Sequence, residues 1–373
     1  MIYLDSAATT LQKPRTVPQA MQAAATRYAS PGRGGYPAAM GAAEVLFTCR
    51  ELAAELFHAP GSEQVIFTSN ATMALNIAIR SLVRPGMTVV VSGYEHNAVT
   101  RCVSAIPDVT VLVAEGELFQ PEQLVRSYQK WMNRADVAIC NAVSNVFGYC
   151  LPVADIAALC RRSQVPLIVD ASQAAGCLPV DMAAWGAAYV AMPGHKSLYG
   201  PQGTGILLCA ADANPTPLLY GGTGSQSRDQ AMPDFLPDRL EAGTENVPGV
   251  AGLLEGMRFV RQKGIGRILR HERQLTRWLG QTLRQMERVE VFLAEDAALQ
   301  TGVLSFRVDG MDCEEVGQRL SQAGIAVRTG LHCAPFAHRS AGTLETGTVR
   351  VSTSAFNNQR EMEQTARVLR SFL

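Results

Sequence analysis

Short apolar runs recur along the chain, and they constrain its fold more than any other feature of the sequence. The runs are QVIFT (64–68), MTVVVS (87–92), VTVLV (109–113), ADVAIC (135–140), VPLIVD (165–170), AAYVAM (187–192) and TGILLC (204–209). Between them, residues 71–83 and 153–163 repeat apolar side chains at helical spacing, so strands and helices alternate. This alternation predicts an α/β fold with a mostly parallel central sheet and helices on both of its faces.

The pattern changes after residue 210. Residues 210–250 are rich in Gly, Pro and Asp, which indicates an irregular segment of the kind that often carries function. Helical stretches (249–287 and 311–324), an apolar run (302–308) and a last helix from Asn358 follow. Because 373 residues exceed one ordinary domain, we expect two. The large one covers residues 16–248, and a smaller α+β domain combines residues 1–15 and 249–373.

Composition excludes several classes of partner. Lys plus Arg equals Asp plus Glu at 33 each, so no net field attracts nucleic acid or anionic lipid. No apolar run approaches the ~20 residues that cross a bilayer, and the N-terminus has no charged leader before an apolar segment. We therefore expect a cytoplasmic protein. The nine cysteines form no CxxC pair, so neither a disulfide framework nor a zinc ribbon is indicated, and we expect no metal site.

Polar residues follow several of the apolar runs, at the strand ends where parallel sheets bind ligands. They are Ser69 to Thr72, His96, Asn145, Asp170 with Gln173, and Lys196. Taken alone, each has an ordinary alternative. Ser69 to Thr72 and Asp170 could simply be helix caps, and His96 could have a structural role. Asn145 could belong to a turn, and Lys196 could be a solvated surface charge.

Together these residues indicate a functional site, because in combination they suit one ligand, pyridoxal 5'-phosphate (PLP). PLP requires a lysine for a Schiff base, a carboxylate beside its pyridine nitrogen, a flat ring over it and donors for its phosphate. Lys196, Asp170, His96 and the turn from Ser69 to Thr72 supply these groups. Lys196 lies in MPGHKSLYGPQGTG (192–205), whose glycines allow a tight turn. The absence of GxxxxGK argues against a nucleotide phosphate loop.

The order and spacing of these pieces resemble a known family across nearly the whole chain. The pieces are YLDSAATT, TSNATMALN, YEHNAV, SNVFG, VDASQAAG, GHKSLYGPQGTG, EAGTEN, RTGLHCAP and TVRVSTSAFNN. The chain resembles the class V, fold-type I aminotransferase-like enzymes, and most closely the cysteine desulfurase and selenocysteine lyase family. The resemblance implies a fold-type I PLP-dependent transferase fold.

The resemblance also implies roles for the cofactor-site residues. Lys196 would carry the Schiff base, Asp170 would pair with the pyridine nitrogen, and His96 would stack on the ring. The phosphate would be held by the Ala71 amide, Thr72 and His195, and the phenolic oxygen or the substrate would be contacted by Gln173 and Asn145. Thr244 of EAGTEN would reach the phosphate of a neighbouring subunit, which implies a homodimer with shared active sites.

A second chemical centre lies in residues 328–335, RTGLHCAP. By itself a cysteine beside a histidine in such a loop is as often inert as reactive. With PLP, the resemblance implies that the Cys333 thiolate takes sulfur from L-cysteine as a persulfide and leaves L-alanine. Arg350 in TVRVS matches the position that binds the substrate carboxylate, where a two-pronged donor suits the ligand, and Arg328 and Asn145 join it.

The sequence departs from the family pattern at two positions in these motifs. Pro193 replaces a serine that supplies a phosphate hydroxyl, and Leu331 replaces a histidine next to His332. Three alternatives therefore stay open: a selenocysteine lyase, a class V aminotransferase acting on another amino acid, and a binding protein that keeps the fold without turnover. A protein that accepts the sulfur or selenium is a further expected partner.

Overall fold

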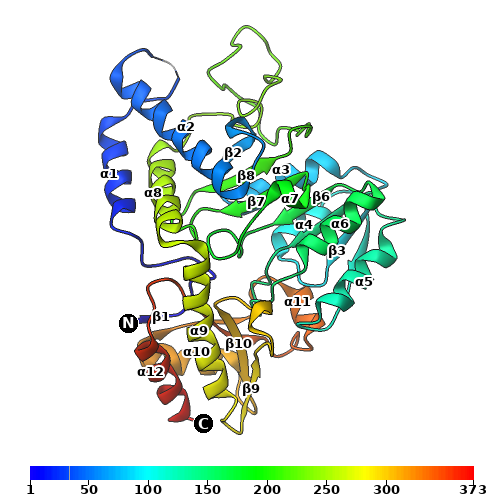
Figure 1. Cartoon of the computed structure of the whole chain (residues 1–373), viewed down its shortest axis with the longest axis vertical. Helices are drawn as coiled ribbons and strands as arrows, with labels where there is room; N and C mark the ends of the chain where they lie inside the picture. Colours follow the sequence, from blue (N-terminus) through cyan, green and yellow to red (C-terminus); the bar gives the residue numbers. More distant parts are fainter. Residues whose placement is uncertain (33) are drawn as a thin grey trace.

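The computed structural model describes residues 1–32 and 34–373 and has a seven-stranded sheet at its centre (Figure 1). Its strands are β2 (Val65–Thr68), β3 (Thr88–Ser92), β4 (Thr110–Ala114), β5 (Val137–Asn141), β6 (Leu167–Asp170), β7 (Tyr189–Pro193) and β8 (Gly205–Cys209), in the order β2-β8-β7-β6-β5-β3-β4. Strands β3 to β7 run parallel, and β8 is antiparallel to both β7 and β2. The expected α/β fold with a mostly parallel sheet is confirmed, although each strand begins one or two residues after the start of the apolar run that predicted it.

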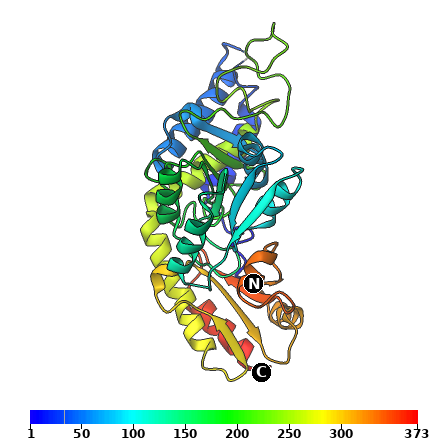
Figure 2. The ribbon, with the colours of Figure 1, turned by 90° about the vertical axis from the view of Figure 1, so that its right-hand side faces the viewer.

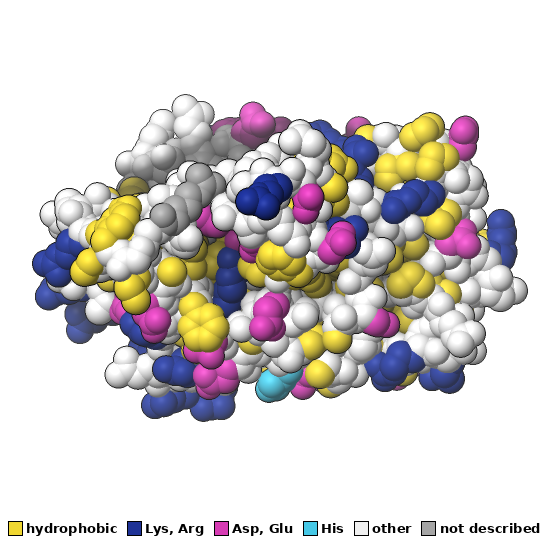
Figure 3. Space-filling view, turned by 90° about the horizontal axis from the view of Figure 1, so that it is seen from above, with side chains coloured by type: hydrophobic (Ala, Val, Ile, Leu, Met, Phe, Trp, Pro, Cys, Tyr) yellow, Lys and Arg dark blue, Asp and Glu magenta, His cyan; other side chains and the backbone are white. Residues whose placement is uncertain are grey.

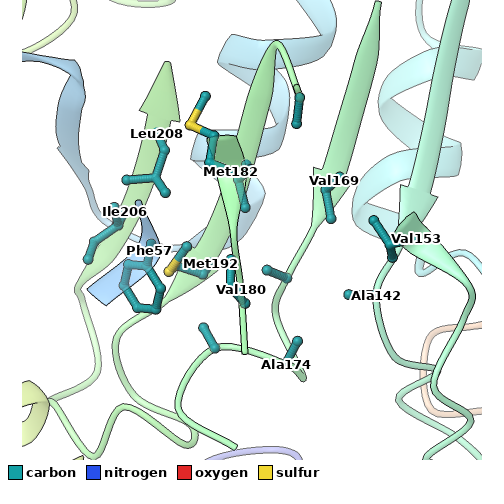
Figure 4. Packing of buried hydrophobic residues seen from close by; sticks show 14 of the residues in the cluster. Phe57, Ala142, Val153, Val169, Ala174, Val180, Met182, Met192, Ile206 and Leu208 are labelled. Carbon is teal, nitrogen blue, oxygen red and sulfur yellow. The ribbon is translucent and has the colours of Figure 1, made fainter. Parts of the chain in front are cut away.

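Helices cover both faces of this sheet. They are α1 (Thr16–Arg27), α2 (Pro37–Phe57), α3 (Ala71–Leu82), α4 (Asn97–Ser104), α5 (Pro121–Trp131), α6 (Val153–Ser163), α7 (Met182–Trp185) and α8 (Val247–Lys263). Successive strand residues point to opposite faces, so Val169 and Met192 pack in one hydrophobic cluster while Ile168 and Ala191 pack in the other. Figure 4 shows the first cluster, in which Val169, Met192, Ile206 and Leu208 of three neighbouring strands lie on the same side as Phe57 of α2.

A second, antiparallel sheet lies at one end of the molecule, with the order β12-β13-β10-β9 (Figure 2). Its strands are β9 (Val289–Phe292), β10 (Val303–Val308), β12 (Arg328–Gly330) and β13 (Thr348–Ser352), and the helices of this region are α9 (Ile265–Leu283), α10 (Cys313–Gln322), α11 (Pro335–Ser340) and α12 (Gln359–Arg370). The N-terminal strand β1 (Ile2–Tyr3) pairs in parallel with β11 (Ile325–Ala326). The start of the chain therefore lies beside its C-terminal third.

Helices α8 and α9 follow each other but pack differently. Helix α8 contacts α1 and α2, whereas α9 contacts β9, β10 and α12. The division into residues 16–248 against 1–15 and 249–373 stays a prediction. Between Cys209 and Val247 the structure assigns no helix or strand, in agreement with the irregular segment expected there. In the part of the chain that the structure describes, no helix is long and apolar enough to cross a membrane.

Candidate active site

The carboxyl ends of the parallel strands bring the expected residues to one edge of the sheet. Asp170, the last residue of β6, lies in register between Asn141 of β5 and Ala191 of β7. The connections that follow the strands then carry their polar side chains over this edge. A single pocket there is lined by Asn70, Ala71, Thr72, His96, Ala98, Asn141, Val143, Asn145, Asp170, Ser172, Gln173, Pro193, His195 and Lys196.

The turn that carries Lys196 is closed by short backbone bonds. Tyr199 N donates to Lys196 O at 2.9 Å, and Gly200 N donates to Gly194 O at 2.8 Å. Gly176 approaches this turn with φ +97°, and a Cβ atom built on it would lie 2.1 Å from Ser197 O, so only glycine fits. Burial lowers the pKa of Lys196 to about 8, although Asp170 acts in the opposite direction. A fraction of the amine is therefore neutral and nucleophilic at neutral pH.

His96 caps α4 with its ring. Its Nδ1 accepts a hydrogen bond from Ala98 N at 3.0 Å, which leaves the proton of the neutral ring on Nε2. Burial lowers the pKa of His96 to about 4, and Asp170 only partly offsets this. His96 is therefore a neutral, fixed ring at neutral pH. Asp170 is held in turn because its Oδ1 accepts from Ser172 N at 2.8 Å.

The first turn of α3 supplies hydrogen-bond donors to the same pocket. Asn70 accepts from Met73 N at 2.9 Å, so the capping side chain leaves the amides of Ala71 and Thr72 to a ligand. His195 also lines the pocket, and its Nδ1 is buried without a partner in the described structure. An anion such as a phosphate fits this cluster of donors.

The pocket fits PLP in its chemistry as well as its position. Lys196 offers an amine, Asp170 a carboxylate, His96 a flat neutral ring and the α3 turn an anion site, all within one lining. Gln173 Nε2 donates to Ala7 O at 2.9 Å, which leaves its oxygen free for the ligand side, and Asn145 Oδ1 is buried with no partner among residues 1–32 and 34–373. Among the described residues, no group of three or more His, Cys, Asp or Glu could hold a metal ion.

Two arginines lie on neighbouring strands next to this pocket. Arg350 of β13 is directly opposite Arg328 of β12, and it is only 2% exposed. Its Nη1 donates to Asn145 O at 2.8 Å and its Nη2 to Asp5 Oδ1 at 2.8 Å. Asn145 belongs to the pocket lining, so this bond ties the guanidinium of Arg350 to the rim.

The loop with Cys333 is also tied to the rim. Asn97 N donates to Cys333 O at 2.7 Å, and Asn145 Nδ2 donates to His332 O at 2.7 Å. Cys333 is exposed, whereas the other eight cysteines of the chain are buried or half-buried. His332 is buried against Thr348, and burial, followed by the nearby Arg350, strongly lowers its pKa. His332 is therefore held inside the fold by its contact with Thr348, while Cys333 next to it is exposed.

Thr244 is not in this pocket. It is exposed and lines a neighbouring hollow together with Ser69 and Met73 of the α3 region. Cys333, Arg328 and Arg350 also lie outside the lining proper, although the bonds above connect the Cys333 loop and Arg350 to it. Asp5 is a residue of this region that sequence reasoning did not single out. Its signal was a lone carboxylate in YLDSAATT, one of the motifs that carry the resemblance.

The α/β fold and a pocket suited to PLP define a PLP-dependent enzyme of fold-type I. A sequence model described as aminotransferase class-V matches residues 2–365, and the chain belongs to that family.

Several known proteins are similar to this chain in sequence or in structure. A probable cysteine desulfurase of Methanothermobacter thermautotrophicus is 34% identical over 97% of this chain and 92% of its own length. A probable cysteine desulfurase of Aeropyrum pernix is 32% identical over 100% of this chain and 94% of its own length. The apo structure of a cysteine desulfurase from Thermococcus onnurineus superposes with a TM-score of 0.91 at 28% identity, covering 100% of this chain and 94% of that one. The crystal structure of a cysteine desulfurase from Escherichia coli in its S-sulfonic acid form superposes with a TM-score of 0.86 at 25% identity. The match covers 99% of this chain and 94% of that one.

Proposed function

We propose that this chain is a PLP-dependent cysteine desulfurase that converts L-cysteine to L-alanine and holds the sulfur as a persulfide on Cys333. One observation carries the proposal: an exposed thiol lies on a loop hydrogen-bonded to the rim of the pocket that contains Lys196 and Asp170. The relatives named cysteine desulfurase support the substrate.

The cofactor would be held by residues of four strand ends. Lys196 would bind it covalently, Asp170 would keep its ring nitrogen protonated, and His96 would cover its ring. The Ala71 and Thr72 amides, with His195, would bind its phosphate. When bound, PLP supplies the electron sink that makes the substrate Cα–H acidic.

Lys196 would then act as the general base and acid. Its pKa of about 8 suits an amine that takes the proton from the substrate Cα and returns a proton to carbon near neutral pH. The pKa of His96 is about 4, which makes this ring a cover and not a competing base at neutral pH. Asn145 would orient the substrate between Lys196 and His96.

The sulfur transfer balances without an added oxidant or reductant. The Sγ thiolate of Cys333 bonds to the substrate sulfur, the substrate C–S bond breaks, and its electron pair remains with the substrate carbon, which takes a proton. The products are L-alanine and the persulfide. Arg350 and Arg328 would hold the substrate α-carboxylate meanwhile, because a guanidinium pairs with a carboxylate through two parallel bonds.

The test is alanine release by the holoenzyme with a thiol reductant, comparing wild type with Cys333→Ala. We expect release from L-cysteine to fall at least ~100-fold, the scale on which loss of an activated nucleophile acts, while PLP absorbance stays unchanged. Cys313→Ala is the matched control, since Cys313 is buried. Wild-type release from L-cysteine by Cys333→Ala contradicts the persulfide role. If only L-selenocysteine is turned over, the chain is a selenocysteine lyase, and keto-acid-dependent amino transfer would make it an aminotransferase.

The proposal includes a cytoplasmic homodimer with shared active sites. In its support, Thr244 is exposed in a hollow beside the phosphate side of the pocket, so it is accessible to a second subunit. Large exposed hydrophobic residues, among them Met40, Phe47 and Tyr220, offer surface for such a contact. Figure 3 shows hydrophobic side chains between charges of both signs on the face seen from above. Sedimentation of the holoenzyme tests the dimer, and a protein that accepts the sulfur is a further proposed partner.

A further inference from the structure

The counter-ion of Arg350 comes from the N-terminal segment of the chain. Asp5 Oδ1 accepts from Arg350 Nη2 at 2.8 Å across 345 residues of sequence, and the side chain of Asp5 is 20% exposed. Its backbone is fixed beside β13, because Asp5 forms a bridge with Ser352, and Ser352 N donates to Leu4 O at 2.8 Å. Asp5 is therefore held in place by the sheet and not only by the ion pair.

The charges around Arg350 do not balance. Arg328 lies directly opposite Arg350 on the neighbouring strand, where like charges repel each other. Asp170 is assigned to the ring nitrogen of the cofactor, and Asp5 is hydrogen-bonded to Arg350, so it compensates only one of the two guanidinium groups. Arg350 Nε is also buried without a partner in the described structure. One positive charge and one buried donor are left, which suits a single additional carboxylate.

We infer that Asp5 sets how tightly this site holds an α-carboxylate. Asp5 keeps Arg350 charged and oriented when no amino acid is bound, because a buried guanidinium without a counter-ion is costly. The same negative charge repels an incoming carboxylate that shares Arg350, so binding is weaker than two arginines alone would give. Both the substrate and the product L-alanine carry that carboxylate, and weak binding lets the product leave. Asp5 is a positioning residue that acts through Arg350, and the inference rests on the proposed function.

The experiment separates the charge of Asp5 from its hydrogen bond. Asp5→Asn keeps an oxygen that can accept from Arg350 Nη2 but removes the negative charge, whereas Asp5→Ala removes both. For the holoenzyme we expect Asp5→Asn to lower both KM for L-cysteine and the calorimetric Kd for L-alanine by about tenfold, equivalent to about 1.4 kcal/mol. Asp5→Ala should raise both, because Arg350 loses the group that orients it.

A ligand without a carboxylate and a matched variant are the controls. L-alaninamide lacks the carboxylate, so its Kd should stay within about twofold in Asp5→Asn, whereas a merely structural effect would change both ligands alike. Glu290→Gln removes the carboxylate partner of Arg307 in the same small sheet and should leave KM unchanged. If Asp5→Asn does not fold, Asp5→Ser removes the charge and keeps a hydroxyl acceptor.

The outcomes show whether Asp5 acts through its negative charge or only through its structural role. Unchanged or weaker L-alanine binding by Asp5→Asn overturns the inference, as does equal tightening for L-alaninamide. Failure of the proposed function looks different, because the wild-type holoenzyme would then release no alanine from L-cysteine. The comparison of L-alanine with L-alaninamide still decides the role of Asp5 in that case.

Discussion

The lowered pKa of Lys196 has a direct kinetic consequence for cofactor capture by the apoprotein. At its ordinary pKa of 10.5 a lysine is about 0.03% neutral at pH 7, whereas a pKa of about 8 leaves about 9% neutral. The neutral amine is the form that attacks the PLP aldehyde. Lys196 should therefore have ~300 times more reactive amine at pH 7 than an unperturbed lysine.

The assay follows the absorbance change when PLP is added to the apoprotein between pH 6.5 and 10.5. Each rate is divided by that for Nα-acetyl-lysine under the same conditions, which cancels the titration of PLP itself. Because Lys196 is already deprotonated above its pKa of about 8, the ratio should be largest near pH 7 and fall between pH 8 and 10.5. Borohydride trapping and peptide mapping locate the modified residue, and Lys196→Ala should give no fast phase.

A ratio that stays constant from pH 7 to 10.5 would contradict this prediction, because burial would then not have lowered the pKa of Lys196. A slow reaction with the expected pH dependence would still agree with the prediction, because restricted access to the pocket lowers the rate by the same factor at every pH. Asp170→Asn adds a second arm. Asp170 raises the pKa of Lys196, so its loss should move the fall of the ratio to lower pH.

Two stability predictions follow from buried contacts. Glu241 accepts from Arg50 Nη1 at 2.8 Å and from Phe67 N at 2.6 Å, so Glu241→Gln should leave a buried cation unpaired and cost about 3–5 kcal/mol of unfolding free energy in urea. The exposed pair of Glu315 and Arg319 supplies the control, since Glu315→Gln should cost at most about 1 kcal/mol, and equal losses would rule out burial as the cause. Gly176→Ala should cost about 1–3 kcal/mol from its positive φ alone, and more from its contact with the lysine turn. It should also slow PLP capture, and an unchanged capture rate would show that the turn adjusts freely.

Much of the fold and of the cofactor pocket could be predicted from the sequence. Alternating apolar runs and helical stretches are local signals, and they gave the mostly parallel sheet because strand and helix periodicities are set by the backbone. Parallel strands end at one edge of the sheet, so Asp170, His96 and Lys196 could be placed together from their positions after three runs. The same reasoning placed the α3 turn beside them.

The rest depended on contacts between distant segments, which leave no periodic signal in the chain. The sequence alone does not bring Asp5 to Arg350, or the carbonyl of His332 to Asn145, because parallel pairing of β1 with β11 and the position of β13 create those contacts. Nor does it contain the pKa of Lys196, since that value follows from burial by residues of many elements. The order of residues along the chain establishes which chemical groups lie at the strand ends of this protein. Which charges face each other there follows from the folded structure, because electrostatic energy depends on distance and burial and not on order along the chain.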